Sequence, residues 1–111
     1  MIRLSGNTIY LTKGDTLELQ VNVLNKDGTP YLPSEGDVIR FAVKRKYSDA
    51  KPVLVKVIPN DTLRLRLEAE ETQTLDASST PYVYDIEIKM VDGTVDTFID
   101  RQKFYVTEEV Y

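Results

Sequence analysis

Apolar and polar side chains alternate along much of the chain, and the clearest run covers residues 17–23. Its four apolar residues stand at every second position, with Glu18, Gln20 and Asn22 between them. This is the period of a strand with one buried face and one wet face. The segment Asn25-Lys26-Asp27-Gly28 then ends the run, because Asn, Asp and Gly tolerate the positive φ angles of tight turns. We therefore predict a strand over residues 17–23 followed by a turn.

The same period recurs in further segments, which we predict to be strands as well. They cover residues 9–11, 39–44, 53–58, 63–67 and 82–90. In the third of these, three valines alternate with a mixed set of partners. The valines are Val53, Val55 and Val57, and the partners are Leu54, Lys56 and Ile58.

The strongest pattern is the one in residues 82–90, which Pro81 opens. Its aromatic and β-branched residues are typical of a central strand, and we expect Tyr82 and Tyr84 to fill the core with their hydroxyls at its rim. Val91-Asp92-Gly93-Thr94 has the composition of a hairpin turn. The residues of one face are Tyr82, Tyr84, Ile86, Ile88 and Met90.

Two last strands are predicted after this turn, over residues 95–99 and 103–107, with Phe104 and Val106 inward. Residues 68–75 break the alternation and are rich in good helix formers, so we expect one short helical turn near residues 69–75. About eight short strands with turn signals between them predict an all-β fold, an antiparallel immunoglobulin-like β-sandwich. A length of 111 residues fits a single domain over residues 1–111.

Composition narrows the chemistry. The chain has no His and no Cys, which removes Ser-His and Cys-His nucleophiles, His and Cys metal sites and disulfides. Carboxylates, lysines, tyrosines and hydroxyls are the reactive side chains that are left. We expect a protein that is not an enzyme, with no catalytic residue, no cofactor and no metal, and the sequence does not identify its binding residues.

Charge is unevenly divided along the sequence. Residues 1–60 hold nine Lys or Arg and six Asp or Glu, a net charge of +3, whereas residues 61–111 hold five and twelve, a net charge of −7. Such a division suits association with a complementary surface or with further copies of the chain. The alternative is that these charges simply keep a small domain in solution.

Two acidic segments could in principle bind a metal. Glu68, Glu70 and Glu71 could act as paired carboxylates or calcium ligands, but acidic residues at the start of a helix are stabilised by its dipole without any further role. Asn25-Lys26-Asp27-Gly28 resembles part of a calcium loop, yet its Gly comes too early and no Glu closes it. We interpret the first segment as a helix start and the second as a turn.

Basic and aromatic residues offer binding surfaces of other kinds. Lys44-Arg45-Lys46, with Tyr47 and Lys51 nearby, could hold a phosphate backbone, but a net charge of −4 opposes nucleic-acid binding and such residues often protect a strand edge. The five glycines are scattered and form no phosphate loop. Candidate surface tyrosines, which the sequence does not place on one face, are Tyr10, Tyr31, Tyr47, Tyr105 and Tyr111.

The chain shows no targeting signal of its own. Residues 1–7 lack the apolar core of a signal peptide, and no window approaches the apolar run of about 20 residues that spans a bilayer. We expect no membrane association, and export from a bacterium only by lysis or within a larger particle.

Several segments together resemble a β-sandwich domain of tailed bacteriophages and prophages, the N-terminal domain of the baseplate upper protein family. The resemblance covers nearly the whole chain and consists of turn and strand patterns, including Gly14-Asp15, Asp27-Gly28 and Gly36-Asp37. Its segments are Thr8-Ile9-Tyr10-Leu11-Thr12-Lys13-Gly14-Asp15-Thr16, Lys26-Asp27-Gly28-Thr29-Pro30-Tyr31-Leu32, Gly36-Asp37-Val38-Ile39-Arg40-Phe41-Ala42-Val43-Lys44, Tyr82-Val83-Tyr84-Asp85-Ile86-Glu87-Ile88, Asp92-Gly93 and Phe104-Tyr105-Val106-Thr107-Glu108-Glu109-Val110.

The resemblance implies a structural part of the virion tail, assembled in the host cytoplasm. Its partners would be other tail or baseplate proteins and further copies of itself, and the family carries over no catalytic residue. Relatives of this kind continue into a stalk or receptor-binding region, whereas this sequence stops at Tyr111, which suggests either a free-standing part or an adaptor for a fibre. Two alternatives stay open, an extracellular carbohydrate-binding module that uses exposed tyrosines and an enzyme with carboxylate or lysine chemistry.

Overall fold

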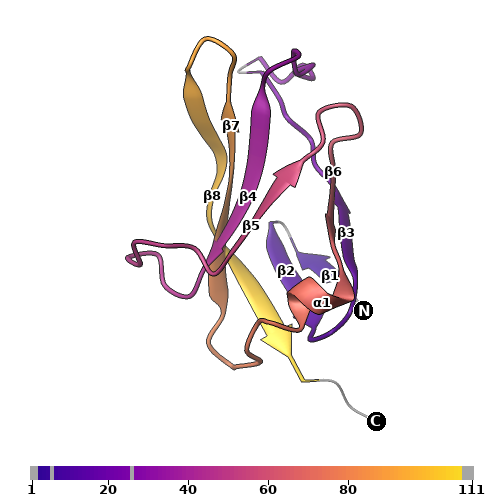
Figure 1. Ribbon diagram of the computed structural model, residues 1–111, viewed down its shortest axis with the longest axis vertical. Helices are drawn as coiled ribbons and strands as arrows, with labels where there is room; N and C mark the ends of the chain where they lie inside the picture. Colours follow the sequence, from indigo (N-terminus) through magenta and orange to yellow (C-terminus); the bar gives the residue numbers. More distant parts are fainter. Residues whose placement is uncertain (1–2, 6, 26, 109–111) are drawn as a thin grey trace.

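The computed structural model describes residues 3–5, 7–25 and 27–108, which form strands and one short helix (Figure 1). Gly6, Lys26 and the terminal Tyr111, all considered above, lie outside the described residues, as do Glu109 and Val110. The elements are β1 (Arg3–Ser5), β2 (Thr8–Thr12), β3 (Leu17–Gln20), β4 (Val38–Lys44), β5 (Leu54–Ile58), β6 (Arg64–Leu67), α1 (Ala69–Thr72), β7 (Tyr82–Lys89) and β8 (Val95–Thr107).

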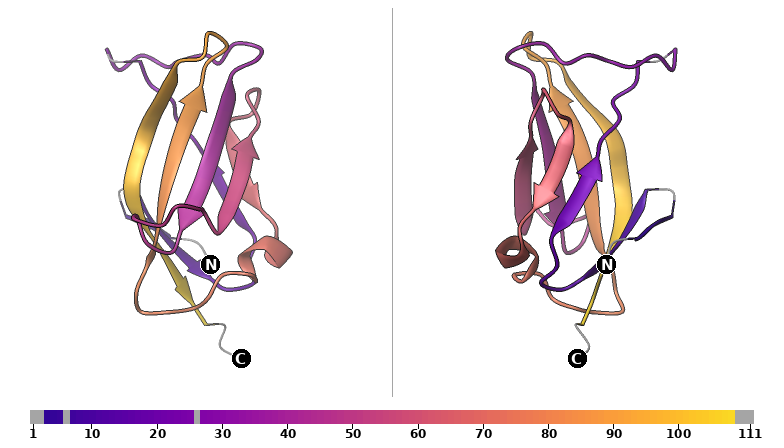
Figure 2. Two further views of the ribbon diagram at one scale, coloured as in Figure 1. Left: turned by 60° about the vertical axis from the view of Figure 1, so that its left-hand side comes forward. Right: turned by 90° about the vertical axis from the view of Figure 1, so that its right-hand side faces the viewer.

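The strands form two facing sheets. A six-stranded sheet has the order β1-β2-β8-β7-β4-β5, and a two-stranded sheet pairs β3 with β6. The left view of Figure 2 shows β8, β7, β4 and β5 side by side, and the right view shows β6 and β3 in front of them. The fold is an all-β sandwich, as the alternation predicted.

The expectation of antiparallel pairing is wrong at one place. β2 and β8 run parallel, with Ile9 opposite Phe104 and Leu11 opposite Val106, while the other paired strands of the described chain are antiparallel. After β2 the chain crosses to the small sheet to form β3, so these two strands make no hairpin and β2 pairs with the last strand instead. Alternation shows which residues share a face of a strand. It does not show whether a neighbouring strand that is distant in sequence runs parallel or antiparallel.

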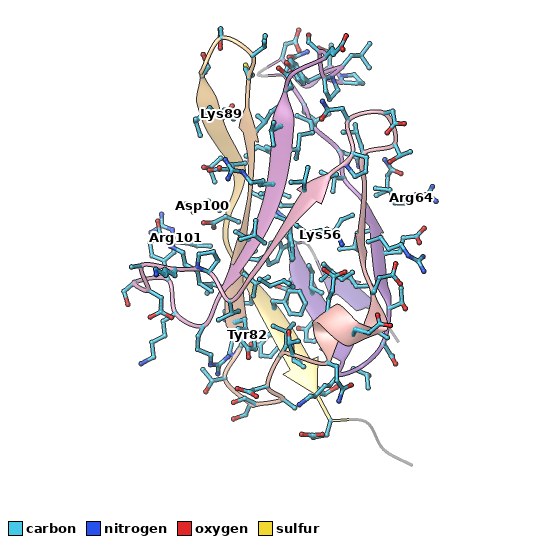
Figure 3. All side chains as sticks on the ribbon, in the orientation of Figure 1. Lys56, Arg64, Tyr82, Lys89, Asp100 and Arg101 are labelled. Carbon is cyan, nitrogen blue, oxygen red and sulfur yellow. The ribbon has the colours of Figure 1, made fainter. Side chains whose placement is uncertain are left out.

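The arrangement is that of an immunoglobulin-like domain. β8, β7, β4 and β5 stand in the order of strands G, F, C and C′ of the variable type, and β3 and β6 take the places of B and E. At the start of β7 the Tyr82 hydroxyl accepts a hydrogen bond of 2.7 Å from the backbone N–H of Asp76. This contact corresponds to the tyrosine corner of such domains. Figure 3 shows Tyr82 at the end of the sandwich near α1.

The core lies between the sheets and contains the inward side of every strand whose side chains are described. Tyr82 and Tyr84 are 3% and 4% exposed, which confirms their predicted place in it. Rings of Phe41, Tyr84 and Phe104 pack with centroids 5.3 to 6.3 Å apart. The Tyr84 hydroxyl donates to the carbonyl of Asn7, and burial raises the pKa of this phenol to about 12.

The number of strands agrees with the prediction, but two of its members differ. β1 was not predicted, and residues 95–99 and 103–107 belong to the single strand β8. The alternation breaks between them because Arg101 adopts a φ of 51° and donates its backbone N–H to the side chain of Asp85, 2.7 Å away. A local irregularity within the single strand β8 therefore looked, in the sequence, like a break between two strands.

The predicted helical turn is present as α1, and turn residues continue the crossing to Leu75. Thr72 is fully buried, and its hydroxyl donates to the carbonyl of Asp15 at 2.7 Å, which joins this crossing to the turn between β2 and β3. Leu75 is also buried in the core. The helix thus covers one end of the sandwich.

Candidate interaction surface

Two carboxylates of the acidic run at residues 68–71 make hydrogen bonds and ion pairs within the domain. Glu68 accepts a 2.7 Å hydrogen bond from Arg66, and Glu71 accepts one of 3.0 Å from the backbone N–H of Glu68. Glu71 also binds the ammonium of Lys56 at 2.9 Å. The backbone donor first, and then Lys56, lower the pKa of Glu71. These contacts support the interpretation of the run as a helix start.

The Asn25 segment is a turn, as predicted. Gly28 has a φ of 87°, and its N–H donates to the carbonyl of Asn25 at 2.9 Å. Asp27 accepts hydrogen bonds from the hydroxyl and the backbone N–H of Thr29, which together lower the pKa of its carboxyl. The Asp27 carboxylate is therefore engaged within the turn.

The basic cluster does not act as one patch. The Arg45 guanidinium lies 4.4 Å from the centre of the Tyr82 ring and donates to the carbonyl of Thr80 at 2.8 Å. The guanidinium of Arg101 lies over one face of the Tyr47 ring, 4.8 Å from its centre. Two members of the predicted cluster thus make contacts within the domain.

Two surface tyrosines come together, which the sequence did not predict. Tyr10 on β2 and Tyr105 on β8 are opposite each other in the parallel pair, and their rings stack 5.1 Å apart with an angle of 5°. Both side chains are half-buried. Tyr31 instead donates a hydrogen bond of 2.6 Å to Asp37. Of the candidate surface tyrosines in the described chain, Tyr10 and Tyr105 thus form one stacked pair, while Tyr31 and Tyr47 contact other residues.

Asp37 is the buried carboxylate of the described chain, 5% exposed. It accepts hydrogen bonds from the Tyr31 hydroxyl, from the N–H of Ser34 at 2.9 Å and from the N–H of Val91 at 3.0 Å. The Tyr31 hydroxyl and then the backbone donor of Ser34 lower the pKa of Asp37. The turn residue suggested by the Gly36-Asp37 pattern is therefore a clamp between the β3–β4 loop and the β7–β8 hairpin.

The charge division along the sequence does not separate two ends of the molecule. Strands from the two halves alternate in the large sheet, because β2 pairs with β8 and β4 pairs with β7. Ion pairs also join the halves, as in Lys56 with Glu71 and Arg64 with Glu18. The net charges of +3 and −7 are therefore interleaved in space.

A cavity of about 250 Å³ lies between the sheets beside β3. It is lined largely by core residues, with Gln20 and Asn22 among its polar members. Its ionisable lining residue in the described chain is Tyr84, whose hydroxyl is committed to Asn7. The cavity is small for an organic ligand, and the described residues that line it include no charged group to orient one.

No group of three or more potential metal ligands occurs in residues 3–5, 7–25 and 27–108. Within the same residues, no helix has the length and apolar character needed to cross a bilayer.

The strongest candidate for an interaction surface is formed by β5 and by Val53, which directly precedes it and donates its backbone N–H to the carbonyl of Val43 at 2.7 Å. Val53, Val55 and Val57 are 50%, 46% and 58% exposed, whereas Ile58 on the opposite side of the strand is buried. We call these three side chains the valine face. Ala42 on β4 stands opposite Val55 and extends the apolar surface by one strand.

The valine face lies on an edge strand. β5 ends the large sheet, and β4 is its strand partner in the described chain. The left view of Figure 2 shows β5 at this edge. Alternate residues of an antiparallel strand point their N–H and C=O groups away from the partner, so β5 presents backbone donors and acceptors beside exposed valines. Such an edge can accept a strand from another chain.

The lysine of this strand does not shield the valine face. A charged residue on an edge commonly prevents unwanted pairing. The Lys56 ammonium, however, donates to both carboxylate oxygens of Glu71 at 2.9 and 3.2 Å. Figure 3 shows Lys56 pointing from β5 toward the small sheet. Its charge is therefore held on the inner side of the strand.

The alternation predicts this strand over residues 53–58 but does not mark its outward face as a site. Its signal was present in the alternation, because residues 53–57 have apolar side chains on both faces apart from Lys56. In a two-layer fold, an edge strand buries only one of its two faces. When both faces are apolar, one of them therefore stays exposed.

The comparisons with known proteins do not assign a class. No protein-family model matches this chain, and no curated protein matches its sequence.

Proposed function

We propose that this protein is a non-enzymatic assembly domain that binds other proteins through the valine face and the edge of β5. The observation that carries the proposal is the exposure of Val55 and Val57 on β5, and of Val53 just before it, at an edge that is unpaired in the described chain. Contiguous apolar side chains on a surface mark contacts with other proteins. Strand addition supplies hydrogen bonds, and the valines supply the apolar contact area.

We propose further that the assembly is the tail of a bacteriophage or of a prophage-derived particle. The support is the resemblance to the N-terminal domain of the baseplate upper protein family, together with an all-β sandwich of immunoglobulin-like type. The partners would be other tail or baseplate proteins and further copies of the chain, and the site of action would be the virion.

Electron microscopy of labelled particles tests the location. Particles induced from the strain that carries the gene are purified, and antibody to this chain is bound with gold. We expect gold at the tail end. A particle preparation with intact tails, no gold and no peptides of this chain by mass spectrometry would refute the tail assignment.

A pair of tagged variants tests the surface in the same particles. Val55→Lys places a charge in the valine face, while Val95→Lys changes an equally exposed valine, 54% against 46%, on β8. We expect loss of the first variant from particles and normal incorporation of the second. Equal incorporation of both would show that the valine face is not the assembly surface.

A carbohydrate-binding module is the second candidate, because Tyr10 and Tyr105 stack in register on one side of the sheet. Aromatic rings at a surface can pack against the apolar face of a sugar. A glycan array with the purified domain distinguishes the two functions. Tyr105→Ala should abolish a genuine signal, and an array without any signal would remove this candidate.

A further inference from the structure

We propose that two copies of this chain pair through β5, strand against strand and antiparallel, with Val55 of each copy opposite Val55 of the other. The inference rests on the proposed assembly role of the valine face, and it names a second copy as the partner. It would join two six-stranded sheets edge to edge across a two-fold axis.

The register follows from the alternation of side chains. In an antiparallel pair, opposing residues lie on the same face of the sheet, so the two-fold axis must pass through a residue if the two sheets are to be continuous. With Val55 on the axis, Val53 of one copy stands opposite Val57 of the other. Every outward residue of the pairing segment then faces a valine, and the two valine faces become one apolar strip.

The neighbouring register is less favourable. An axis through Lys56 would place two lysines directly opposite each other, and like charges opposite each other destabilise a strand pair. In the Val55 register, each Lys56 instead stands opposite Leu54 of the other copy. Its ammonium keeps the contact with Glu71 at 2.9 Å, so its charge already has a partner on the inner side.

A second copy fits this edge because the segment is complementary to itself. Valine opposite valine is a favourable cross-strand combination, and Val53, Val55 and Val57 supply three such pairs around the axis. Of the charged residues of β4 next to this face, Arg40, opposite Val57, is paired with Glu87 at 3.6 Å within its own copy. In the Val55 register the two Lys56 residues are diagonal neighbours on the inner side, where each ammonium stays paired with Glu71 of its own copy.

Prolines limit the contact to this segment. Pro52 and Pro59 flank residues 53–58 and have no backbone N–H to donate to a new ladder. An isologous contact of this kind uses the same surface on both copies. The association therefore closes as a dimer and does not extend into a fibre.

The dimer should be weak in solution. A single short strand pair buries less than the roughly 1,200–2,000 Å² of a standard stable interface. We therefore expect a dissociation constant between about 10 μM and 1 mM, with dimers favoured where many copies are held together.

Sedimentation equilibrium tests the association over about 10 μM to 1 mM protein, the same range as the expected dissociation constants. The average mass should rise with concentration from 12.7 kDa toward the value of two chains. Val55→Lys, which brings two cations to the axis, should remain monomeric, while Val95→Lys should dimerise like the parent. Circular dichroism of both variants verifies that they fold.

Single cysteines test the register, since the chain has no cysteine of its own. Directly opposite residues have Cα atoms about 4.5–5.5 Å apart, within the range that a disulfide spans. Val55→Cys should therefore cross-link efficiently under mild oxidation. Val53→Cys should not, because four residues separate the two copies of this position, roughly 13 Å along the strand. The double variant Val53→Cys with Val57→Cys should cross-link again.

Three results would overturn the proposal. They are a monomer at every concentration, an equal loss of dimer in Val55→Lys and Val95→Lys, and equal cross-linking of Val53→Cys and Val55→Cys. A monomer that is nevertheless found on tails by gold labelling would overturn the dimer and leave the proposed function standing. A dimer that is absent from tails would support the proposed pairing and refute the tail assignment.

Discussion

The outer surface of the small sheet and that of β5, at the edge of the large sheet, share one alternating pattern and present opposite chemistry. On the small sheet, Glu18 of β3 binds Arg64 and Arg66 of β6 at 3.1 and 2.7 Å, and Arg66 binds Glu68 at 2.7 Å. We call these four residues the charge ladder. Figure 3 shows Arg64 pointing away from the sandwich. The large sheet instead ends in the valine face on β5.

The difference teaches that outward strand positions are not equivalent. In the charge ladder, opposite charges pair across the strands, with Glu18 in register with Arg66, and they keep that surface hydrated. In the valine face, shape and apolarity are the same at every outward position. The first surface is complete within one chain, whereas the second leaves apolar area and backbone groups without a partner in the described residues.

The largest effect should come from the inner side of the strand that bears the valine face. Ile58→Ala removes a fully buried side chain, and we expect a loss of about 2–5 kcal/mol in the free energy of unfolding. Val57→Ala, on its exposed neighbour, should change it by about 0.5 kcal/mol or less. Urea unfolding measures both. Similar losses in the two variants would mean that the outward side of β5 is also packed.

Asp37 should give the next effect, and it depends on pH. Its carboxylate is bound by Tyr31 and by two backbone N–H groups, which hold its pKa below the ordinary value of 3.8. Because the folded pKa is the lower one, the charged form stabilises the fold above the ordinary value, and this contribution is lost as pH falls toward the folded pKa.

Asp37→Asn should therefore lower the melting temperature at pH 7 and flatten its dependence on pH below about 4. Scanning calorimetry from neutral to acidic pH measures this, with the exposed Glu108→Gln as the control. An unchanged acid limb in Asp37→Asn would show that the clamp does not contribute to acid unfolding.

The charge ladder should respond to salt. Arg66→Met removes the guanidinium that, with Arg64, lowers the pKa of Glu18. We expect a small loss of stability at low ionic strength that disappears near 1 M salt, because exposed ion pairs are screened. Arg40→Met, whose pair with Glu87 is longer at 3.6 Å, is the matched control and should change less. A loss that persists in high salt would indicate packing of the Arg66 side chain.

The smallest effect on stability should come from the valine face itself. Replacing Val53, Val55 and Val57 together by Thr keeps β-branched side chains at exposed strand positions, so each change should alter the free energy of unfolding by about 0.5 kcal/mol or less. Self-association should nevertheless be lost. Val43→Thr, at a fully buried position, is the contrasting variant and should be clearly destabilised. Retained dimerisation in the triple variant would contradict the role of the valine face.

Much of the fold could be predicted from local pattern. The alternation located β3, β4, β6 and β7, and it identified Tyr82 and Tyr84 as core residues. Successive side chains of a strand point to opposite faces, so a strand with one buried face has apolar residues at every second position. It did not reveal that Arg101 bends one continuous strand, or that Tyr10 stacks on Tyr105. These depend on a side-chain acceptor from β7 and on the parallel neighbour of β2.

The candidate site shows the same division. By itself, the sequence predicted a strand over residues 53–58, found as Leu54–Ile58, with apolar side chains on both faces, one of which includes Lys56. A set of three valines would be the more apolar choice for the interior. Only the tertiary structure decided that Leu54 and Ile58 face inward, because Glu71 on α1 receives the ammonium of Lys56 and β4 fixes the register. The valines were thereby left on an outer edge, where a second chain can reach them.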